Sequence, residues 1–276
     1  MEQVKVRLDE AMETSLLTLY GKAIDARRKP SILGDTMAVA AIDRVDYDFT
    51  RLKSAGRVAP NAAARAKHFD NWAREFLATH ERATVLHLGA GLDTRVWRLD
   101  PGPGVRWYDV DFPKVVDIRR QIFPDRDNYH LIGASVTAPE WLDKVPADLP
   151  TLIVAEGLTM YLRPEEGHEL FRRITDRFPS GTLLIDGQSR LALRMVNKKL
   201  SRSLGSGQIM HWAIEDPQEL VRVNPKLRFV DGVSAMTAPT TAQLPGGMRI
   251  VVAISRLVPA LRDIGFYLRY EFGDTR

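Results

Sequence analysis

The chain has 276 residues, of which 45% are hydrophobic and 27% are charged, and its formal net charge at pH 7 is +4. These values are typical of a soluble globular protein with a sizeable core, and they argue against wholesale disorder. The sequence contains no cysteine, which excludes disulfides, thiolate metal sites and a cysteine nucleophile.

The sequence also lacks the usual signals of several other classes of protein. The six histidines include no HExxH motif, so we expect no metal, and the absence of a zinc finger or long basic tract argues against a nucleic-acid partner. No uncharged apolar run approaches the ~20 residues of a membrane helix, so we expect no membrane partner. The early charges in MEQVKVRLDE are unlike a secretory signal, which makes a cytoplasmic location the expectation.

Residues 1–80 are predicted to be mainly helical. Apolar residues recur at helical spacing from Leu8 to Leu19. A long helix is expected after Pro60, where Asn61 is placed to cap its start.

From residue 84 the pattern changes to short apolar runs that alternate with helix-like segments. The runs are TVLHLG (84–89), VRWYDVD (105–111), NYHLIGAS (128–135), TLIVAEG (151–157) and TLLIDG (182–187). Strands that alternate with helices predict repeated βα units and a parallel sheet with right-handed crossovers. We therefore expect an α/β protein with an open, doubly wound, Rossmann-like sheet.

The alternation stops at residues 187–226, which are predicted to form part of a cap. Two later runs, 227–233 and 249–255, are predicted as strands of an antiparallel hairpin at the sheet edge. The expected organisation is a single domain over 1–276, with a core at 80–186 and 227–256 and a helical cap built from 1–60 and 187–226.

A glycine-rich turn, HLGAGLDTR, is expected where the first strand ends. Gly89 and Gly91 would let a nucleotide cofactor approach the backbone without interference from side chains. Asp111 lies 22 residues after Gly89, close to the ~20-residue offset of a carboxylate that accepts both ribose hydroxyls. Asp109 shares its strand face, but Asp111 is nearer the strand end.

Structural roles for these residues remain open as alternatives. The glycines could form a strand-to-helix turn without a ligand, and Asp111 could cap the helix expected near Pro113. The turn, the acidic offset and the βα alternation together favour a cofactor site. Thr94 replaces the third glycine of a dinucleotide fingerprint, and the charge of Asp93 opposes a pyrophosphate but suits the sulfonium and ammonium of S-adenosylmethionine.

Three segments carry a family resemblance. LGAGLDTRVWRLD, WYDVDFP and AEGLTMYL resemble the leucine carboxyl methyltransferase family, and more closely its bacterial branch of tetracenomycin-type polyketide O-methyltransferases. The resemblance extends in order over most of residues 14–230. It implies a class I S-adenosylmethionine-dependent methyltransferase fold, with S-adenosylmethionine as donor and S-adenosylhomocysteine as product.

The resemblance also implies which residues bind the cofactor. Gly89 and Gly91 match the family's cofactor glycines, and Asp111 matches its ribose-binding aspartate. Arg65 matches the arginine that binds the methionine carboxylate. Lys22 matches a basic residue that assists it, although this position is more often arginine in the branch, and lysine loses the bidentate fork.

Two further matches concern the ammonium group and the adenine ring. Glu156 matches the glutamate near the methionine ammonium. Ser135 stands where the wider family commonly has an aspartate for adenine, and its hydroxyl would bond adenine less strongly than a carboxylate. The alternatives are an exposed helix position for Arg65, a helix-terminal role for Glu156 and a surface position for Lys22.

Methyl transfer from a sulfonium is an in-line displacement, so the protein must mainly align the reactants and exclude water. A carboxylate acceptor is ionised at neutral pH, whereas a phenol would benefit from a general base. His211, beside Trp212 in the expected cap, is a candidate for that base or for orienting the substrate. The alternative is that both residues pack the cap. Tyr20 is a candidate for the substrate pocket.

The sequence therefore predicts an O-methyltransferase that acts on a carboxylate or hydroxyl of a small, polyketide-like or aromatic molecule. The alternatives are a protein C-terminal carboxyl methyltransferase and a non-catalytic S-adenosylmethionine-binding protein. An NAD oxidoreductase is disfavoured, because no Tyr-x-x-x-Lys follows the fourth strand. No prediction of the oligomeric state follows from these motifs.

Overall fold

The computed structural model describes residues 4–5, 10–52, 54–204 and 209–273. Leu8, where the first helical pattern was expected to begin, lies outside these ranges. Within the described part of the chain, none of the helices has the length and apolarity needed to cross a bilayer.

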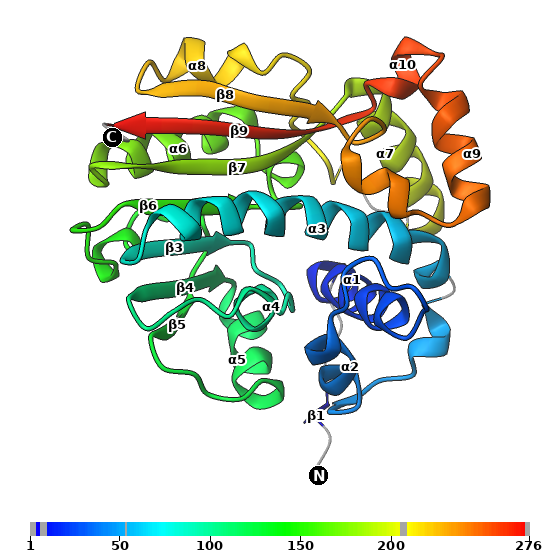
Figure 1. Cartoon of the computed structure of the whole chain (residues 1–276), viewed down its shortest axis with the longest axis horizontal. Coiled ribbons are helices and arrows are strands. Elements are labelled where there is room, and N and C mark those ends of the chain that lie inside the picture. The colour runs from blue at the N-terminus through cyan, green and yellow to red at the C-terminus, as the bar shows by residue number, and fades with distance from the viewer. Residues whose placement is uncertain (1–3, 6–9, 53, 205–208, 274–276) are drawn as a thin grey trace.

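A seven-stranded sheet forms the centre of the molecule, in the order β5-β4-β3-β6-β7-β9-β8 (Figure 1). Its strands are β3 (Ala83–Leu88), β4 (Val105–Asp111), β5 (Tyr129–Gly133), β6 (Thr151–Ala155), β7 (Ser180–Gln188), β8 (Leu227–Ser234) and β9 (Gly265–Gly273). β3 to β7 are parallel, and β9 runs antiparallel to both β7 and β8. The expected parallel sheet with an antiparallel C-terminal pair is confirmed.

One of the two strands predicted for that pair is wrong. Residues 249–255 lie in helix α9 (Gly246–Ser255), and the partner of β8 is β9, beyond the expected end of the core at residue 256. The β-branched residues of 249–255 favour a strand locally. Packing overrides that preference, because Val252 is buried against Ala63 and Ala64 of the helical layer, while Ile250 and Ile254 stay exposed.

The helices lie on both sides of the sheet. They are α1 (Glu10–Ala26), α2 (Thr36–Ile42), α3 (Ala55–Thr79), α4 (Arg95–Leu99), α5 (Pro113–Ile122), α6 (Pro164–Arg177), α7 (Arg190–Leu204), α8 (Gln218–Val223), α9 and α10 (Pro259–Arg262). A short pair, β1 (Val4–Lys5) and β2 (Val45–Asp46), lies outside the main sheet. Helix α3 begins five residues before the expected Pro60, which lies inside it.

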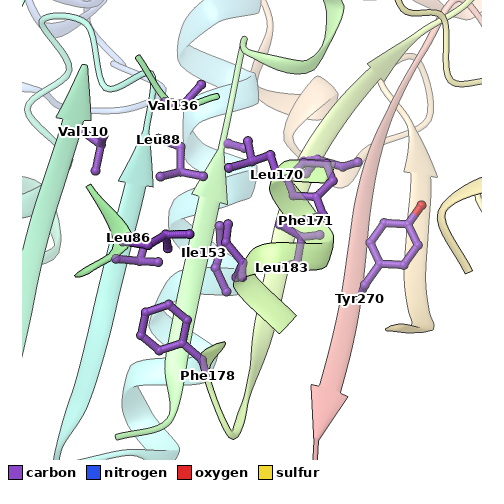
Figure 2. Packing of buried hydrophobic residues seen from close by; sticks show 14 of the residues in the cluster. Leu86, Leu88, Val110, Val136, Ile153, Leu170, Phe171, Phe178, Leu183 and Tyr270 are labelled. Carbon is purple, nitrogen blue, oxygen red and sulfur yellow. The ribbon is translucent and has the colours of Figure 1, made fainter. Parts of the chain in front are cut away.

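Alternate side chains of the strands feed two separate cores. Leu86 and Leu88 of β3 pack with α6 and α8 on one face, as part of the cluster in Figure 2, whereas Val85 packs with α3 and α4 on the other. Burial of both faces explains why the central strands β3 and β6 are predominantly apolar. A third cluster joins α1 and α2 to α5. The strands and the helices α1 and α3 thus hold the ends of β3, β4 and β6 in fixed positions.

A close contact between Gly167 of α6 and Trp212 gives a test of this packing. A methyl group added at Gly167 would lie 2.0 Å from a ring carbon of Trp212, which is fully buried. Glycine to alanine in a helix ordinarily stabilises by roughly 0.5–1 kcal/mol. Here Gly167→Ala is expected to lower the free energy of unfolding by about 1–3 kcal/mol, because the ring has to move.

Urea denaturation followed by circular dichroism measures this effect. Gly56→Ala in α3 is the matched control, since a methyl group there meets nothing within 4 Å. Its midpoint should be unchanged or slightly raised. Equal midpoints for the two variants would contradict the packing described for Trp212.

Candidate active site

A cavity of about 280 Å³ lies beyond the carboxyl ends of β3 and β6. Its wall is built from α1, α3, α7, the turn after β3 and the segment after β6. The lining residues are Thr14, Ser15, Thr18, Lys22, Arg65, His87, Gly89, Ala90, Gly91, Asp93, Glu156, Gly157, Met160, Tyr161, Gln188, Ala192, Val196 and Met210. In an open α/β sheet, this edge is the usual place for a ligand.

The turn after β3 has a backbone that favours glycine. Gly89 and Gly91 have φ values of +60° and +52°. A methyl group on Gly89 would touch Leu158 at 3.0 Å, and one on Gly91 would touch Ser15 at 3.0 Å. Side chains at either position would therefore be strained and would fill the space where the backbone meets the cavity.

Asp111 at the end of β4 holds this turn. Its Oδ2 accepts a hydrogen bond from the Gly91 N–H at 2.6 Å, and its Oδ1 accepts one from the Phe112 N–H at 2.7 Å. Burial raises the pKa of Asp111, and the two backbone donors offset only part of this effect. Beside it, the ring of Phe112 is 53% exposed, which is unusual for a phenylalanine.

Asp109, two residues earlier, is engaged inside the protein. It is fully buried, accepts hydrogen bonds from Trp107 Nε1 at 2.8 Å and Tyr129 Oη at 2.6 Å, and forms an ion pair with Arg119. His87 Nδ1 lies 3.1 Å from it. Its interactions therefore serve the core, and Asp111 is the acid of this pair at the strand end.

A second polar centre joins α3 to the end of β6. Arg65 Nε donates to Glu156 Oε1 at 2.9 Å, and Arg65 Nη1 donates to Asp186 Oδ2 at 2.9 Å. Burial alone would raise the pKa of Glu156, but the guanidinium groups of Arg95 and Arg65 outweigh it and lower that pKa. Burial likewise opposes the charge of Arg65, but Glu156 and Asp186 raise its pKa. Both partners stay charged at neutral pH.

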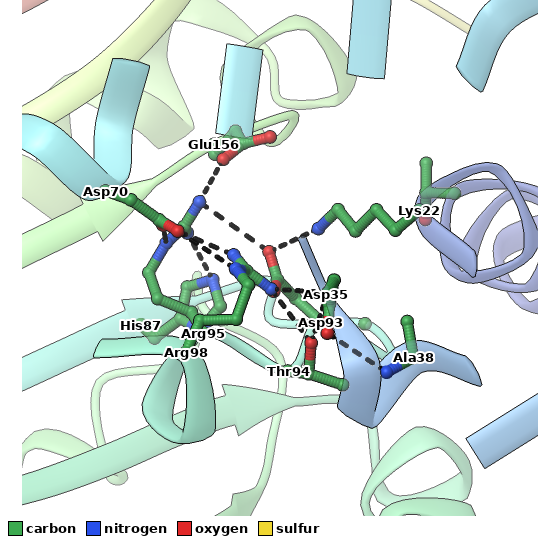
Figure 3. Close-up of polar contacts among 12 residues, drawn as sticks. Lys22, Asp35, Ala38, Asp70, His87, Asp93, Thr94, Arg95, Arg98 and Glu156 are labelled. Atoms are coloured by element: carbon green, nitrogen blue, oxygen red, sulfur yellow. Dashed lines mark hydrogen bonds and ion pairs between the residues drawn. The ribbon is translucent and has the colours of Figure 1, made fainter. Parts of the chain in front are cut away.

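A network of buried ion pairs connects Glu156 to the charged residues behind the cavity wall (Figure 3). Arg95 is fully buried, donates to Asp70 at 2.7 Å and to His87 Nε2 at 3.0 Å, and also binds Glu156. Asp93 pairs with Lys22 at 2.7 Å.

Arg98 closes the same network on its far side. It bonds to Asp93, Asp70 and Asp35 at 2.7, 2.9 and 2.9 Å. Burial raises the pKa of Asp93, but Arg98 and Lys22 reverse the shift and keep that pKa well below its ordinary value.

Four candidate residues from the sequence do not line the cavity: Asp111, which bonds to the turn after β3, and Ser135, Tyr20 and His211. Ser135 follows β5, is half-buried and shares a hydrogen bond with Thr137 at 2.8 Å. Tyr20 packs on Phe49 with ring centroids 4.8 Å apart. The ring of His211 is exposed, and its backbone N–H donates to the carbonyl of Met160 at 2.8 Å.

Lys22, Arg65, Gly89, Gly91 and Glu156 all line the cavity, and Asp111 bonds directly to its turn. Sequence reasoning missed Asp186 and the arginines behind Glu156. The signal for Asp186 was present, since it is the sole charged residue in the apolar run TLLIDG. The buried Arg95 gave no such signal, because its segment also reads as an ordinary amphipathic helix start.

Comparison with known proteins gives one family. A profile of the leucine carboxyl methyltransferase family matches residues 15–175. The chain is 41% identical over 268 residues to the tetracenomycin polyketide synthesis O-methyltransferase TcmP of Streptomyces glaucescens, covering 97% of this chain and 98% of that protein. It is 32% identical over 249 residues to the S-adenosyl-L-methionine-dependent methyltransferase dpfgK of Gibberella zeae, covering 83% of this chain and 84% of that protein.

Solved structures resemble the fold at low sequence identity. A candidate methyltransferase from Thermobifida fusca has a TM-score of 0.60 at 16% identity and covers 92% of this chain and 94% of its own. A DUF574 family protein from Streptomyces avermitilis has a TM-score of 0.59 at 12% identity, with 90% and 97% covered. With the sheet order described above, these likenesses confirm the class I methyltransferase fold.

Proposed function

The chain belongs to the leucine carboxyl methyltransferase family and is an S-adenosylmethionine-dependent methyltransferase, and on this premise we propose that it esterifies the carboxylate of a small polyketide-type acid. The observation that carries the proposal is the cavity itself. A glycine turn with an acid at its base lies beside an arginine–glutamate pair in one cavity. These groups match the two ends of S-adenosylmethionine, a nucleoside and an amino acid.

We assign the nucleoside end to the side of the cavity formed by the turn after β3, which lies next to the end of β4. The backbone of Gly89 and Gly91 allows close approach, and Asp111 offers a carboxylate for the ribose hydroxyls. Ser135, after β5, would bond adenine, and the exposed ring of Phe112 would offer it a stacking surface.

We assign the amino-acid end to the opposite side. Arg65 would bind the methionine carboxylate, assisted by Lys22, and Glu156 would bind the ammonium. Each charged group of the methionine end would thus face a protein group of opposite charge. The negative pyrophosphate of a dinucleotide would instead be repelled by Asp93 and Glu156 in the lining. S-adenosylmethionine supplies an activated methyl group, and the protein's task is to align the acceptor with it and to exclude water.

The acceptor side of the cavity is largely apolar. Met160, Tyr161, Ala192, Val196 and Met210 line it, which suits an acceptor with a large apolar surface, and we propose a polyketide because TcmP is named for polyketide synthesis. α1 and α7, from the two segments expected as the cap, contribute to the same wall. We therefore propose that these helices select the acceptor.

The acidic, basic and histidine side chains of the lining are already engaged, which favours a carboxylate as nucleophile. His87 bonds to Asp109 and Arg95, Glu156 to Arg65 and Arg95, and Asp93 to Lys22. A carboxylate is ionised at neutral pH and needs no proton acceptor, whereas a phenol with a pKa near about 10 does.

Incubation with labelled S-adenosylmethionine and a matched pair of aromatic polyketide-type acceptors, one an acid and one a phenol, tests the proposal. A methyl ester releases labelled methanol in alkali, whereas a methyl ether does not. We expect label in the alkali-labile fraction from the acid. Alkali-stable label from the phenol alone would show that a hydroxyl is the nucleophile.

His211→Ala is expected to change the rate of ester formation by less than about twofold, because the imidazole is exposed and lies outside the described lining. Steady-state rates with the acid and the phenol measure this. A loss above tenfold confined to the phenol would instead assign His211 as a general base. An equal loss for both acceptors would indicate that it orients them.

A further inference from the structure

Asp186 of β7 is a fully buried carboxylate that contacts two groups of the cavity wall without lining the wall itself. Its Oδ2 accepts from Arg65 Nη1 at 2.9 Å, and its Oδ1 accepts from the Gly157 N–H at 2.7 Å. We propose that Asp186 is a positioning residue that sets the affinity of the protein for the amino-acid end of the cofactor. The inference rests on the proposed placement of the methionine carboxylate at Arg65.

Two of the three guanidinium nitrogens of Arg65 bond to carboxylates of the protein, and the third is left for a ligand. Nε is used by Glu156 and Nη1 by Asp186, whereas Nη2 has no hydrogen bond within the described residues. A methyl group on Gly157 would lie 3.3 Å from Nη2, so this nitrogen faces the turn after β6. Two carboxylates on neighbouring edges fix the plane of the guanidinium.

Fixing this plane before the ligand arrives affects binding directly. A free arginine side chain loses rotamer entropy when it is ordered. Because Asp186 and Glu156 already order Arg65, a ligand carboxylate would not bear that cost.

Asp186 also holds the turn after β6. Gly157 has a φ of +71°, and its N–H is fixed by Asp186 Oδ1. The hydroxyl of Thr159 donates to the backbone carbonyl of Asp186 at 2.5 Å. One residue of β7 therefore ties both the α3 arginine and the turn that follows Glu156, so a change at Asp186 moves two contacts of the amino-acid end together.

A positioning role and a merely structural role differ in which ligands they affect. Asp186→Asn keeps the size of the side chain. Its NH₂ group, itself a donor, would face either Arg65 Nη1 or the Gly157 N–H, both of which now donate to a carboxylate oxygen. The variant is expected to raise the Kd of S-adenosylhomocysteine by about 10- to 100-fold. The Kd of 5′-methylthioadenosine, which has the nucleoside but no amino-acid end, should change less than about twofold.

Calorimetric titration of the full chain with both ligands measures this selectivity. The matched control is Asp25→Asn, a buried aspartate that accepts from Ser31 and from the backbone of Ile32 and Leu33. It is expected to leave the ratio of the two Kd values unchanged. In steady-state kinetics Asp186→Asn should raise the KM for S-adenosylmethionine much more than it lowers kcat, because the carboxylate contact is the same in the ground and transition states.

Three results would overturn the proposal. Equal weakening of both ligands would make Asp186 structural, and no weakening of either would remove it from the site. If the variant does not fold, Arg65→Lys, which keeps the charge but not the fork, must show the same selective loss; a uniform loss would contradict the proposal. Failure of the unmodified protein to bind S-adenosylhomocysteine would instead contradict the placement of the cofactor.

Discussion

Asp111→Ala is expected to raise the Kd of S-adenosylhomocysteine by at least about 100-fold. The carboxylate lies at the end of β4 and already fixes the Gly91 N–H at 2.6 Å, so its loss removes both the proposed ribose acceptor and the support of the turn. Two charge-assisted hydrogen bonds of about 1.5–3 kcal/mol each correspond to a factor of this size or larger.

Calorimetric titration of the purified variant measures the change, with thermal unfolding as a check on folding. The control is Asp117→Ala, an exposed acid of α5 that pairs with Arg120 and lies outside the described lining. It should bind like the unmodified protein. Binding by Asp111→Ala within about threefold of the unmodified protein would refute the ribose assignment.

The largest effect on stability is expected at Arg95. This side chain is fully buried and bonds to Asp70, Glu156 and His87. Arg95→Met removes the positive charge and leaves carboxylates uncompensated in the interior. Removing one partner of a buried ion pair typically costs about 3–5 kcal/mol of unfolding free energy.

Urea denaturation of Arg95→Met checks this value. Arg172→Met on α6 is the comparison, because Arg172 is 53% exposed and pairs with Glu169 and Asp176 at the surface. Surface pairs contribute little, so its midpoint should be close to that of the unmodified protein. If the two variants unfold at the same urea concentration, the network in Figure 3 contributes far less than its burial implies.

The parallel part of the fold was predictable because its signal is local. Strands buried on both faces are rich in apolar residues, and the predicted run at 105–111 coincides with β4. β9 was missed because Arg269 and Glu271 interrupt its apolar pattern. The helix at 246–255 was mistaken for a strand because it is apolar on its outer side as well as its inner side, which removes the helical periodicity.

The residues of the candidate site also differ in whether their signal in the sequence is local. Gly89, Gly91 and Asp111 belong to motifs whose spacing is set within one βα unit, so the sequence points to them. Asp186 and Arg65 meet only because β7 and α3 are packed together, 121 residues apart in the chain. His211 was a candidate because it lies next to Trp212 in the expected cap. The structure buries the indole of Trp212 and exposes the imidazole of His211, because adjacent side chains in a chain often point in different directions.

The position of β9 between β7 and β8 determines how much of the chain must be synthesised before the sheet can be completed. β7 and β8 do not pair with each other, so both edges stay open until residues 265–273 have left the ribosome. Asp186 lies opposite Tyr267 in that last pairing, and until it forms, β7 is an exposed edge. The cavity is therefore expected to be completed only after synthesis of β9, so a nascent chain that stalls before β9 would expose β7 to aggregation while being unable to hold the cofactor.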